Sequence, residues 1–145
     1  MDEAERKQEA ERESEAERKR ETERKVIEAV VRDYVDGMVR FDLERLRSAL
    51  HPLFVQSGHY KGQFEFFDRD AFIELFEGEE ATEPEVEHEA EITVIDVTGD
   101  IAVAKVTGEF RDTSFTDYLT LIMVENRWQI VMRAFFDHAG PEPQG

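Results

Sequence analysis

The stretch that decides the fold is Phe115-Thr-Asp-Tyr-Leu-Thr-Leu-Ile-Met-Val-Glu-Asn-Arg-Trp-Gln-Ile-Val131. Two runs of alternating apolar residues flank a short polar turn at Glu125-Asn126-Arg127, and Trp128 opens the second run. Alternation of this kind on both sides of a short turn is typical of a β-hairpin. The pattern therefore predicts two antiparallel strands, Thr113 to Val124 and Trp128 to Asp137.

Upstream of this hairpin, the spacing of apolar residues predicts an α+β domain. Val26 to about Arg40 carries one wide apolar stripe at helical spacing. Asp42 and Asp68 each precede a short amphipathic segment, where a carboxylate can accept hydrogen bonds from the free N–H groups of the first helical turn. The other predicted elements are helices Leu43 to Leu50 and Arg69 to Phe76, and strands Leu53 to Tyr60, Gln63 to Phe67, Val86 to Val97 and Ile101 to Phe110.

The late strands are apolar on both of their faces. In the strand Ile101 to Phe110, for example, Val103 lies on one face while Ala104 and Val106 lie on the other. A sheet with two apolar faces has to be covered on both sides. The predicted helices are too few to cover both faces, so we expect a second copy of the chain to cover the other and form a homodimer through the sheet.

Composition excludes several classes of function. The 145 residues suit one domain and include no Cys, so we expect no disulfide, no thiolate metal site and no Cys nucleophile. The net charge is −17, of which residues 26–145 carry −15, and such a surface repels phosphate backbones. We expect no nucleic-acid partner, no membrane segment and a cytoplasmic location.

The acidic surface has two interpretations that the sequence leaves open. An excess of acid with only two Lys residues after position 25 is compatible with a high-salt cytoplasm, where screening removes self-repulsion. The other interpretation, which we favour, is an ordinary acidic, soluble protein.

Residues 1–25 form a segment distinct from the domain that follows. They hold 10 acidic and 8 basic side chains, with opposite charges at helical spacing in pairs such as Glu15 and Lys19. Large apolar residues at heptad positions are missing, so a coiled coil is not expected. We predict a solvated helix that runs into the domain at 26–138, with a partner-docking arm or an artificial extension as alternatives, and a loose tail at 139–145.

Three local motifs give the chain a family resemblance. They are Tyr34-Val-Asp-Gly-Met with Asp42-Leu-Glu-Arg-Leu, Ile95-Asp-Val-Thr-Gly-Asp-Ile-Ala-Val-Ala, and Phe115-Thr-Asp-Tyr-Leu-Thr-Leu with Arg127-Trp-Gln-Ile-Val. With this element order, residues 26–138 resemble the nuclear transport factor 2-like superfamily, and most closely its lumazine-binding and polyketide-cyclase-like group. The resemblance implies a cone-shaped, strongly curved antiparallel sheet on N-terminal helices, with a pocket for a small apolar ligand.

The catalytic residues of two groups of relatives are missing at the matching positions of this chain. The dehydratase-like relatives have a Tyr-Asp pair late in the first helix, where Met38-Val39 stands here. The isomerase-like relatives have a carboxylate base early in the first strand region, where Ser57-Gly58 stands here. Both departures argue against those chemistries, and one fold hosts many functions.

Polar residues within the apolar strands are the candidates for a site. His59 can exchange protons near neutral pH and could face either the pocket or the solvent. Asp117 and Tyr118 are adjacent in one strand and point to opposite faces, so only one of them can face the interior. Buried Asp117 would need a partner, and Arg133 on the neighbouring strand is the residue we expect there. The pair could be a structural ion pair, a dimer contact or part of a site, and a structural role is favoured over catalysis.

The predicted function is binding of a small, mostly apolar molecule inside the cone, with little or no catalysis. The ligand-binding candidates are Tyr34, Met38, His59, Phe72, Asp117 and Arg133, and the other aromatic residues that could line the interior are Phe66, Phe76, Phe110, Phe115 and Phe135. One alternative is a cofactor-free lyase, isomerase or cyclase with His59 as general base. Another is an interaction module that docks through the N-terminal helix. No metal or cofactor is expected, because the four His residues lack ligand spacing.

Overall fold

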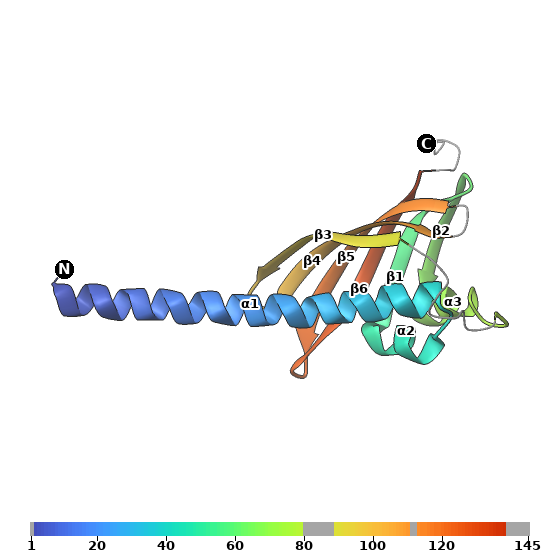
Figure 1. Ribbon diagram of the computed structural model, residues 1–145. Coiled ribbons are helices and arrows are strands. Elements are labelled where there is room, and N and C mark those ends of the chain that lie inside the picture. The colour runs from blue at the N-terminus through green and yellow to red at the C-terminus, as the bar shows by residue number, and fades with distance from the viewer. Residues whose placement is uncertain (1, 80–88, 111–112, 139–145) are drawn as a thin grey trace.

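The computed structural model describes residues 2–79, 89–110 and 113–138 (Figure 1). Along these residues, two helices come first, two strands and a third helix follow, and four further strands complete the order. The elements are α1 (Glu3–Val39), α2 (Leu43–Ala49), β1 (Leu50–Tyr60), β2 (Gln63–Asp68), α3 (Arg69–Glu74), β3 (Glu89–Thr98), β4 (Ile101–Phe110), β5 (Thr113–Val124) and β6 (Arg127–Asp137).

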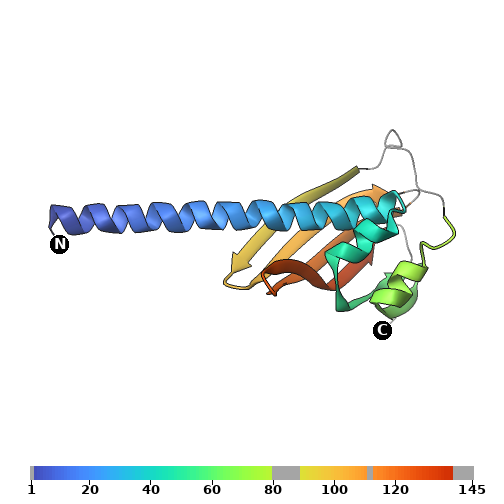
Figure 2. The same cartoon turned by 90° about the horizontal axis from the view of Figure 1, so that it is seen from below.

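The six strands form one sheet in the order β2-β1-β6-β5-β4-β3. Every neighbouring pair is antiparallel except β1 and β6, which run parallel. In Figures 1 and 2 the helices lie along one side of this twisted, bent sheet. The predicted α+β architecture is therefore confirmed.

Tight turns join β5 to β6 and β1 to β2. The hairpin between β5 and β6 turns at Glu125 and Asn126, both with positive φ (52° and 62°). Two consecutive residues with positive φ match the twist of antiparallel strands, and Asn and Gly tolerate this conformation best. Lys61 and Gly62 make the same kind of turn between β1 and β2 (φ 52° and 82°). The hairpin predicted between Thr113 and Asp137 is present, and its second strand begins at Arg127, one residue earlier than predicted.

Helix α1 is one continuous helix with two environments. Its first buried side chain is Ile27, and the part before it projects beyond the sheet as an exposed rod (Figure 2). Asp2 caps its start by accepting a hydrogen bond from Glu5 N at 2.8 Å. The prediction of a solvated helix that continues into the first domain helix agrees with this structure. No helix of the described residues combines the length and apolarity needed to cross a membrane.

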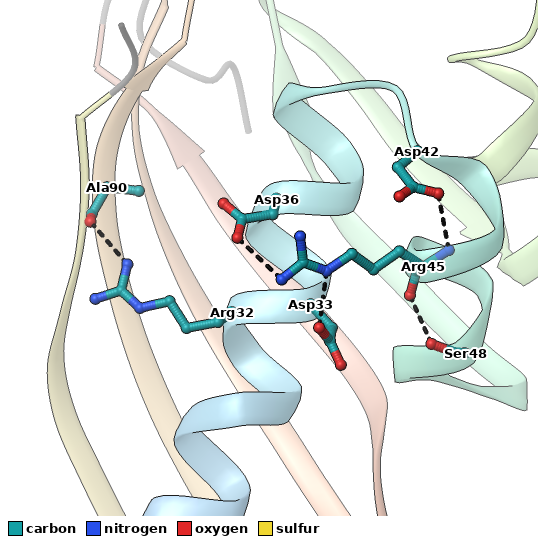
Figure 3. Close-up of polar contacts among 7 residues, drawn as sticks. All are labelled: Arg32, Asp33, Asp36, Asp42, Arg45, Ser48 and Ala90. Carbon is teal, nitrogen blue, oxygen red and sulfur yellow. Dashed lines mark hydrogen bonds and ion pairs between the residues drawn. The ribbon is translucent and has the colours of Figure 1, made fainter. Parts of the chain in front are cut away.

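A polar clamp fixes α2 against α1 (Figure 3). The Arg45 guanidinium contacts Asp33 Oδ1 at 2.8 Å through Nε and Asp36 Oδ2 at 3.1 Å through Nη2. Asp42 caps α2 as predicted, by accepting a hydrogen bond from Arg45 N. The two helices also approach closely at Gly37, where an added Cβ would lie 2.6 Å from Leu46 N.

The two faces of the sheet differ in what covers them. The inner face packs on the helices and forms the core, with Val106, Leu119 and Ile130 fully buried. The outer face leaves large apolar side chains exposed across the sheet. They are Phe64 and Phe66 on β2, Val94 on β3, Ile101 and Val103 on β4, Tyr118 on β5, and Met132 and Phe136 on β6. The prediction that helices cover only one of two apolar faces is confirmed.

A few predicted boundaries differ from the structure. β1 begins at Leu50 rather than Leu53, because the chain enters the sheet directly after α2 and passes Pro52 through an irregularity in its pairing with β6. α3 ends at Glu74, two residues before the predicted end. The tail at 139–145, His88 and the start predicted for the strand at 86–88 lie outside the described residues.

Candidate functional site

Three charged or polar side chains meet inside the core between α1, β5 and β6. Tyr34 Oη donates a hydrogen bond to Asp117 Oδ2 at 2.6 Å, and Arg133 Nη2 lies 3.0 Å from Asp117 Oδ1. Tyr34 and Asp117 are 0% exposed and Arg133 is 8% exposed. The three residues form a buried polar cluster, which is called the interior cluster below.

Strand register brings these side chains together. Asp117 and Arg133 occupy inward-facing positions on the neighbouring strands β5 and β6, where Asp117 pairs with Phe135 and Arg133 pairs with Leu119. Residues paired across antiparallel strands share a face, so Asp117 and Arg133 are diagonal neighbours. Tyr34 reaches the same point from α1, whose apolar stripe packs on this face.

The parallel pairing of β1 with β6 extends the cluster toward the sheet edge. This pairing sets Gln56 opposite Arg133, and Arg133 Nη1 donates to Gln56 Oε1 at 2.9 Å. Gln56 Nε2 in turn donates to Glu65 Oε2 on β2 at 3.2 Å. A continuous polar chain therefore runs from Tyr34 to Glu65 through a mostly apolar interior.

Aromatic rings enclose the Arg133 guanidinium. Its central carbon lies 4.5 Å from the ring centre of Phe135 and 5.4 Å from that of Phe72. Gly58 makes room for the Phe135 ring, because a Cβ at that position would lie 2.6 Å from Phe135 Cδ1. Contacts between a guanidinium and aromatic faces stabilise the cation while they keep water away from it.

The hydrogen bonding of the cluster is incomplete. Among the described residues, Arg133 Nε has no hydrogen-bond partner although it is buried. Asp117 Oδ1 is close to Arg133 Nη2, but this contact is an ion pair rather than an aligned hydrogen bond, and that oxygen also lacks a hydrogen-bond partner among the described residues. A buried donor or acceptor without a partner costs about 1–3 kcal/mol, so native proteins rarely keep one without a reason.

Burial controls the protonation of the cluster. Burial raises the pKa of Tyr34 well above its usual value, Arg133 opposes this rise and Asp117 adds to it, so Tyr34 stays a neutral donor. Burial alone would lower the pKa of Arg133, but the direct contact with Asp117 and the charges of Asp117, Tyr34 and Glu65 raise it overall. The cluster therefore contains a permanent cation and a neutral phenol.

The structure brings some predicted site residues together and separates others. Asp117 and Arg133 form the expected pair, and Tyr34 and Phe72 contact them. Met38 is buried in the same core. Of the other aromatic candidates, Phe115 and Phe76 pack in or against the core, whereas the side chain of Phe110 lies outside the described residues.

His59 does not lie in the interior. On β1 it pairs with Phe64 of β2 and Phe136 of β6, and both of these are exposed residues of the outer face. Its ring packs 5.6 Å from that of Phe64, centre to centre. Because side chains alternate along a strand, Gln56 and Gly58 face inward while His59 faces outward. His59, the candidate for a pocket position and for a general base, therefore lies on the outer face, and Phe66 is exposed on the same face.

Sequence reasoning missed Gln56 and Glu65. Gln56 is fully buried, and its position becomes meaningful only when β1 pairs with β6 rather than with β2 alone. A polar side chain between Phe54 and Gly58 in a strand was the one available signal. The parallel pairing that gives it a partner joins segments far apart in the chain.

Other features of the described residues add no chemistry to this site. No group of three or more His, Cys, Asp or Glu side chains in the described residues could hold a metal ion. A depression of about 250 Å³ lies along the exposed part of α1, beside Gln8, Glu11, Arg12 and Glu15. It is far along the rod from the interior cluster, on a single helix surface.

Comparison with known proteins defines the family. The family described as "Putative lumazine-binding" matches residues 22–136, which is most of the chain. The chain belongs to this family, and its fold is that of the nuclear transport factor 2-like superfamily. A curated relative, named aldolase FrzH, from a Cladobotryum species is 25% identical over 107 residues, which cover 72% of this chain and 83% of the relative.

Solved structures of similar proteins agree with this assignment. A nuclear transport factor 2-like protein of unknown function from Silicibacter pomeroyi is 30% identical with a TM-score of 0.71, covering 78% of this chain and 93% of that chain. A similar protein from Shewanella baltica is 23% identical with a TM-score of 0.72, covering 83% and 96%. A ketosteroid isomerase-like protein from Erwinia carotovora atroseptica is 15% identical with a TM-score of 0.62, covering 81% and 97%, and this likeness concerns the fold alone.

Proposed function

We propose that the protein binds a small, mostly apolar molecule in the interior between the helices and the sheet, with the interior cluster as its polar anchor. The observation that carries the proposal is the buried Asp117–Arg133–Tyr34 cluster with Arg133 Nε lacking a hydrogen-bond partner. The family description, which refers to a small heterocyclic ligand, supports the same class of function.

Energetics favour a functional cluster over a purely structural one. Replacing a buried ion pair with apolar residues of similar volume is often neutral or stabilising, so a fold does not need such a pair. Functional sites are where proteins keep costly polar groups in apolar surroundings. Here the ion pair lies under the helices, beside the buried aromatic side chain Phe72.

A catalytic form of this proposal would use the interior cluster. Tyr34 and Asp117 share a 2.6 Å hydrogen bond, the geometry of a group that can donate or relay a proton. The aldolase relative lends some support to carbon–carbon lyase chemistry. His59 is excluded from this role because it faces away from the cluster.

Fragment binding mapped by amide NMR tests the proposed function. A library of small neutral ring compounds is titrated into the isotope-labelled full chain. We expect binders to move the amide signals of the inward-facing residues Gln56, Asp117 and Arg133. The outward-facing Tyr118 and His59 act as internal controls and should stay unchanged. Binders that move only outer-face signals, or a library with no binder, would contradict the proposal.

We also propose that two copies associate through the outer face of the sheet. Outward side chains of β1, β5 and β6, all within the described residues, include no Asp or Glu, although residues 26–145 hold 25 acidic side chains. Tyr118 is 60% exposed and Phe136 is 50% exposed on this face. The part of the outer face on β1, β5 and β6 is therefore free of acidic side chains on a strongly acidic chain, and it can meet the same part of a second copy without repulsion between carboxylates.

Sedimentation velocity on charge-insertion variants tests the association. We expect the wild-type chain to sediment as a dimer and Tyr118→Asp to shift it to the monomer, because each copy would add a carboxylate to the interface. Leu75→Asp makes the same apolar-to-acid change at an exposed site beside α3 and should leave the dimer intact. A monomeric wild type, or a dimer unaffected by Tyr118→Asp, would refute the proposal.

A further inference from the structure

We infer that the ligand offers a neutral carbonyl-type oxygen to the Nε–H group of Arg133. This inference rests on the proposed function and adds to it the chemical class of the ligand. The Arg133 guanidinium has five N–H donors in a fixed plane, and each of them needs an acceptor when it is buried.

Protein groups contact both Nη atoms of the Arg133 guanidinium. Nη1 donates to Gln56 and Nη2 pairs with Asp117, whereas Nε lacks a hydrogen-bond partner in the described part of the chain. The rings of Phe72 and Phe135 also lie against the guanidinium, but an aromatic ring of this kind offers no oxygen or nitrogen acceptor to Nε. An acceptor that accepts a hydrogen bond from Nε therefore has to lie near the plane of the guanidinium.

The charges around Arg133 select a neutral acceptor. Asp117 already balances the cation, and the Glu65 carboxylate is linked to Arg133 through Gln56. An anionic ligand would place a further negative charge beside these two carboxylates in a medium that screens poorly. A cationic ligand would face Arg133 itself. A ketone, lactone or amide oxygen satisfies the donor without adding charge.

Three probes with the same bicyclic ring system separate these possibilities. The probes are 1-tetralone, tetralin and 1,2,3,4-tetrahydronaphthalene-1-carboxylate, which present a neutral oxygen, no acceptor and an anion to the full-length protein. NMR titration follows the amide signals and the side-chain Nε–H signal of Arg133. We expect 1-tetralone to move that Nε–H signal and to bind about tenfold or more tightly than either of the other probes, because a hydrogen bond to a charged donor is worth this much.

The variant Arg133→Lys provides the matched control. Lysine keeps the positive charge beside Asp117 but has no planar Nε–H group. We expect this variant to bind 1-tetralone only as well as tetralin, with its affinity for tetralin unchanged. If the variant does not fold, the Nε–H shift in the wild type still decides the inference.

The outcomes distinguish the inference from the proposed function. Equal affinity for 1-tetralone and tetralin, with interior amides moving, would overturn the inference and leave the proposed function intact. Tightest binding of the carboxylate would do the same. An Nε–H signal that does not move with bound 1-tetralone would overturn the inference, because the ligand oxygen would then not meet this donor. No binding of any probe would count against both.

Discussion

At the scale of single residues, Arg133 and Asp117 depend on each other. Each is buried in the core, and each is the other's ion-pair partner. Removing one partner leaves an uncompensated charge in a low-dielectric environment, whereas removing both leaves no buried charge. The pair is therefore expected to be strongly coupled in mutational experiments.

Substitution of Arg133 alone should destabilise the protein severely. We expect Arg133→Met to lower the free energy of unfolding by about 3–5 kcal/mol, because Asp117 remains buried without its cation. Urea denaturation measures the loss. In the variant Asp117→Val/Arg133→Met most of that stability should return. Additive losses in the double variant would show that the two side chains do not form a coupled pair.

Tyr34 should make stability fall at high pH. Burial raises the pKa of the folded-state Tyr34, so its contribution is fully present below the unfolded pKa of about 10 and is lost as pH rises above that value. We expect the free energy of unfolding to decline more gently above pH 10 in Tyr34→Phe than in the wild type. Denaturation at a series of pH values measures the slope. Tyr60→Phe, at a partly exposed phenol, is the control and should behave as the wild type does.

Individual residues also show how far the sequence could predict this site. Asp117 and Arg133 could be paired from the sequence because a hairpin fixes which residues of two adjacent strands share a face. His59 could not be placed, because the alternation of β1 is apolar on both faces and does not reveal which side is inward. Gln56 acquires its role only from the parallel contact between β1 and β6.

At the scale of elements, the contact between α1 and α2 determines where the helices lie on the sheet. Asp42 and the Arg45 clamp could be expected in part, since a capping Asp before an amphipathic segment is a local signal. The close approach at Gly37 could not, because it depends on the crossing of two helices. Local signals therefore gave the elements and their caps, whereas contacts between elements required the structure.

Gly37 offers a test of that helix contact. Gly→Ala in an unobstructed helix usually stabilises by about 0.5–1 kcal/mol. Here the added Cβ would lie 2.6 Å from the Leu46 backbone N, so we expect Gly37→Ala to destabilise by about 1–3 kcal/mol. Thermal and urea denaturation measure the sign. Ser14→Ala on the exposed rod of α1 should be neutral or slightly stabilising, and a stabilised Gly37→Ala would show that the helices are not so close.

At the scale of the whole molecule, the charge of −17 should make stability depend on salt. Screening shortens the range of repulsion between surface charges from about 30 Å at 0.01 M salt to about 3 Å at 1 M. We expect the melting temperature to rise between 10 mM and 1 M KCl. Loss of the folded state at low salt would support adaptation to a high-salt cytoplasm, whereas a flat melting temperature would contradict the expectation.

The whole molecule combines one polar anchor inside with one apolar face outside. The helices, the curved sheet and the parallel β1–β6 pair place the interior cluster beneath the helices. The outer face holds no part of that cluster. The proposed ligand binding and the proposed association therefore involve opposite faces of one sheet, and we expect a substitution that affects one of them to leave the other intact.

The most direct measurement of the central claim compares 1-tetralone binding in the wild type and in Tyr34→Phe/Asp117→Val/Arg133→Met. This variant removes the interior cluster without leaving an uncompensated charge, so it should fold with at least most of the stability of the wild type. If the cluster is the anchor of a ligand site, NMR titration will show an affinity lower by about tenfold or more in the folded variant. Unchanged affinity in the folded variant would contradict the account.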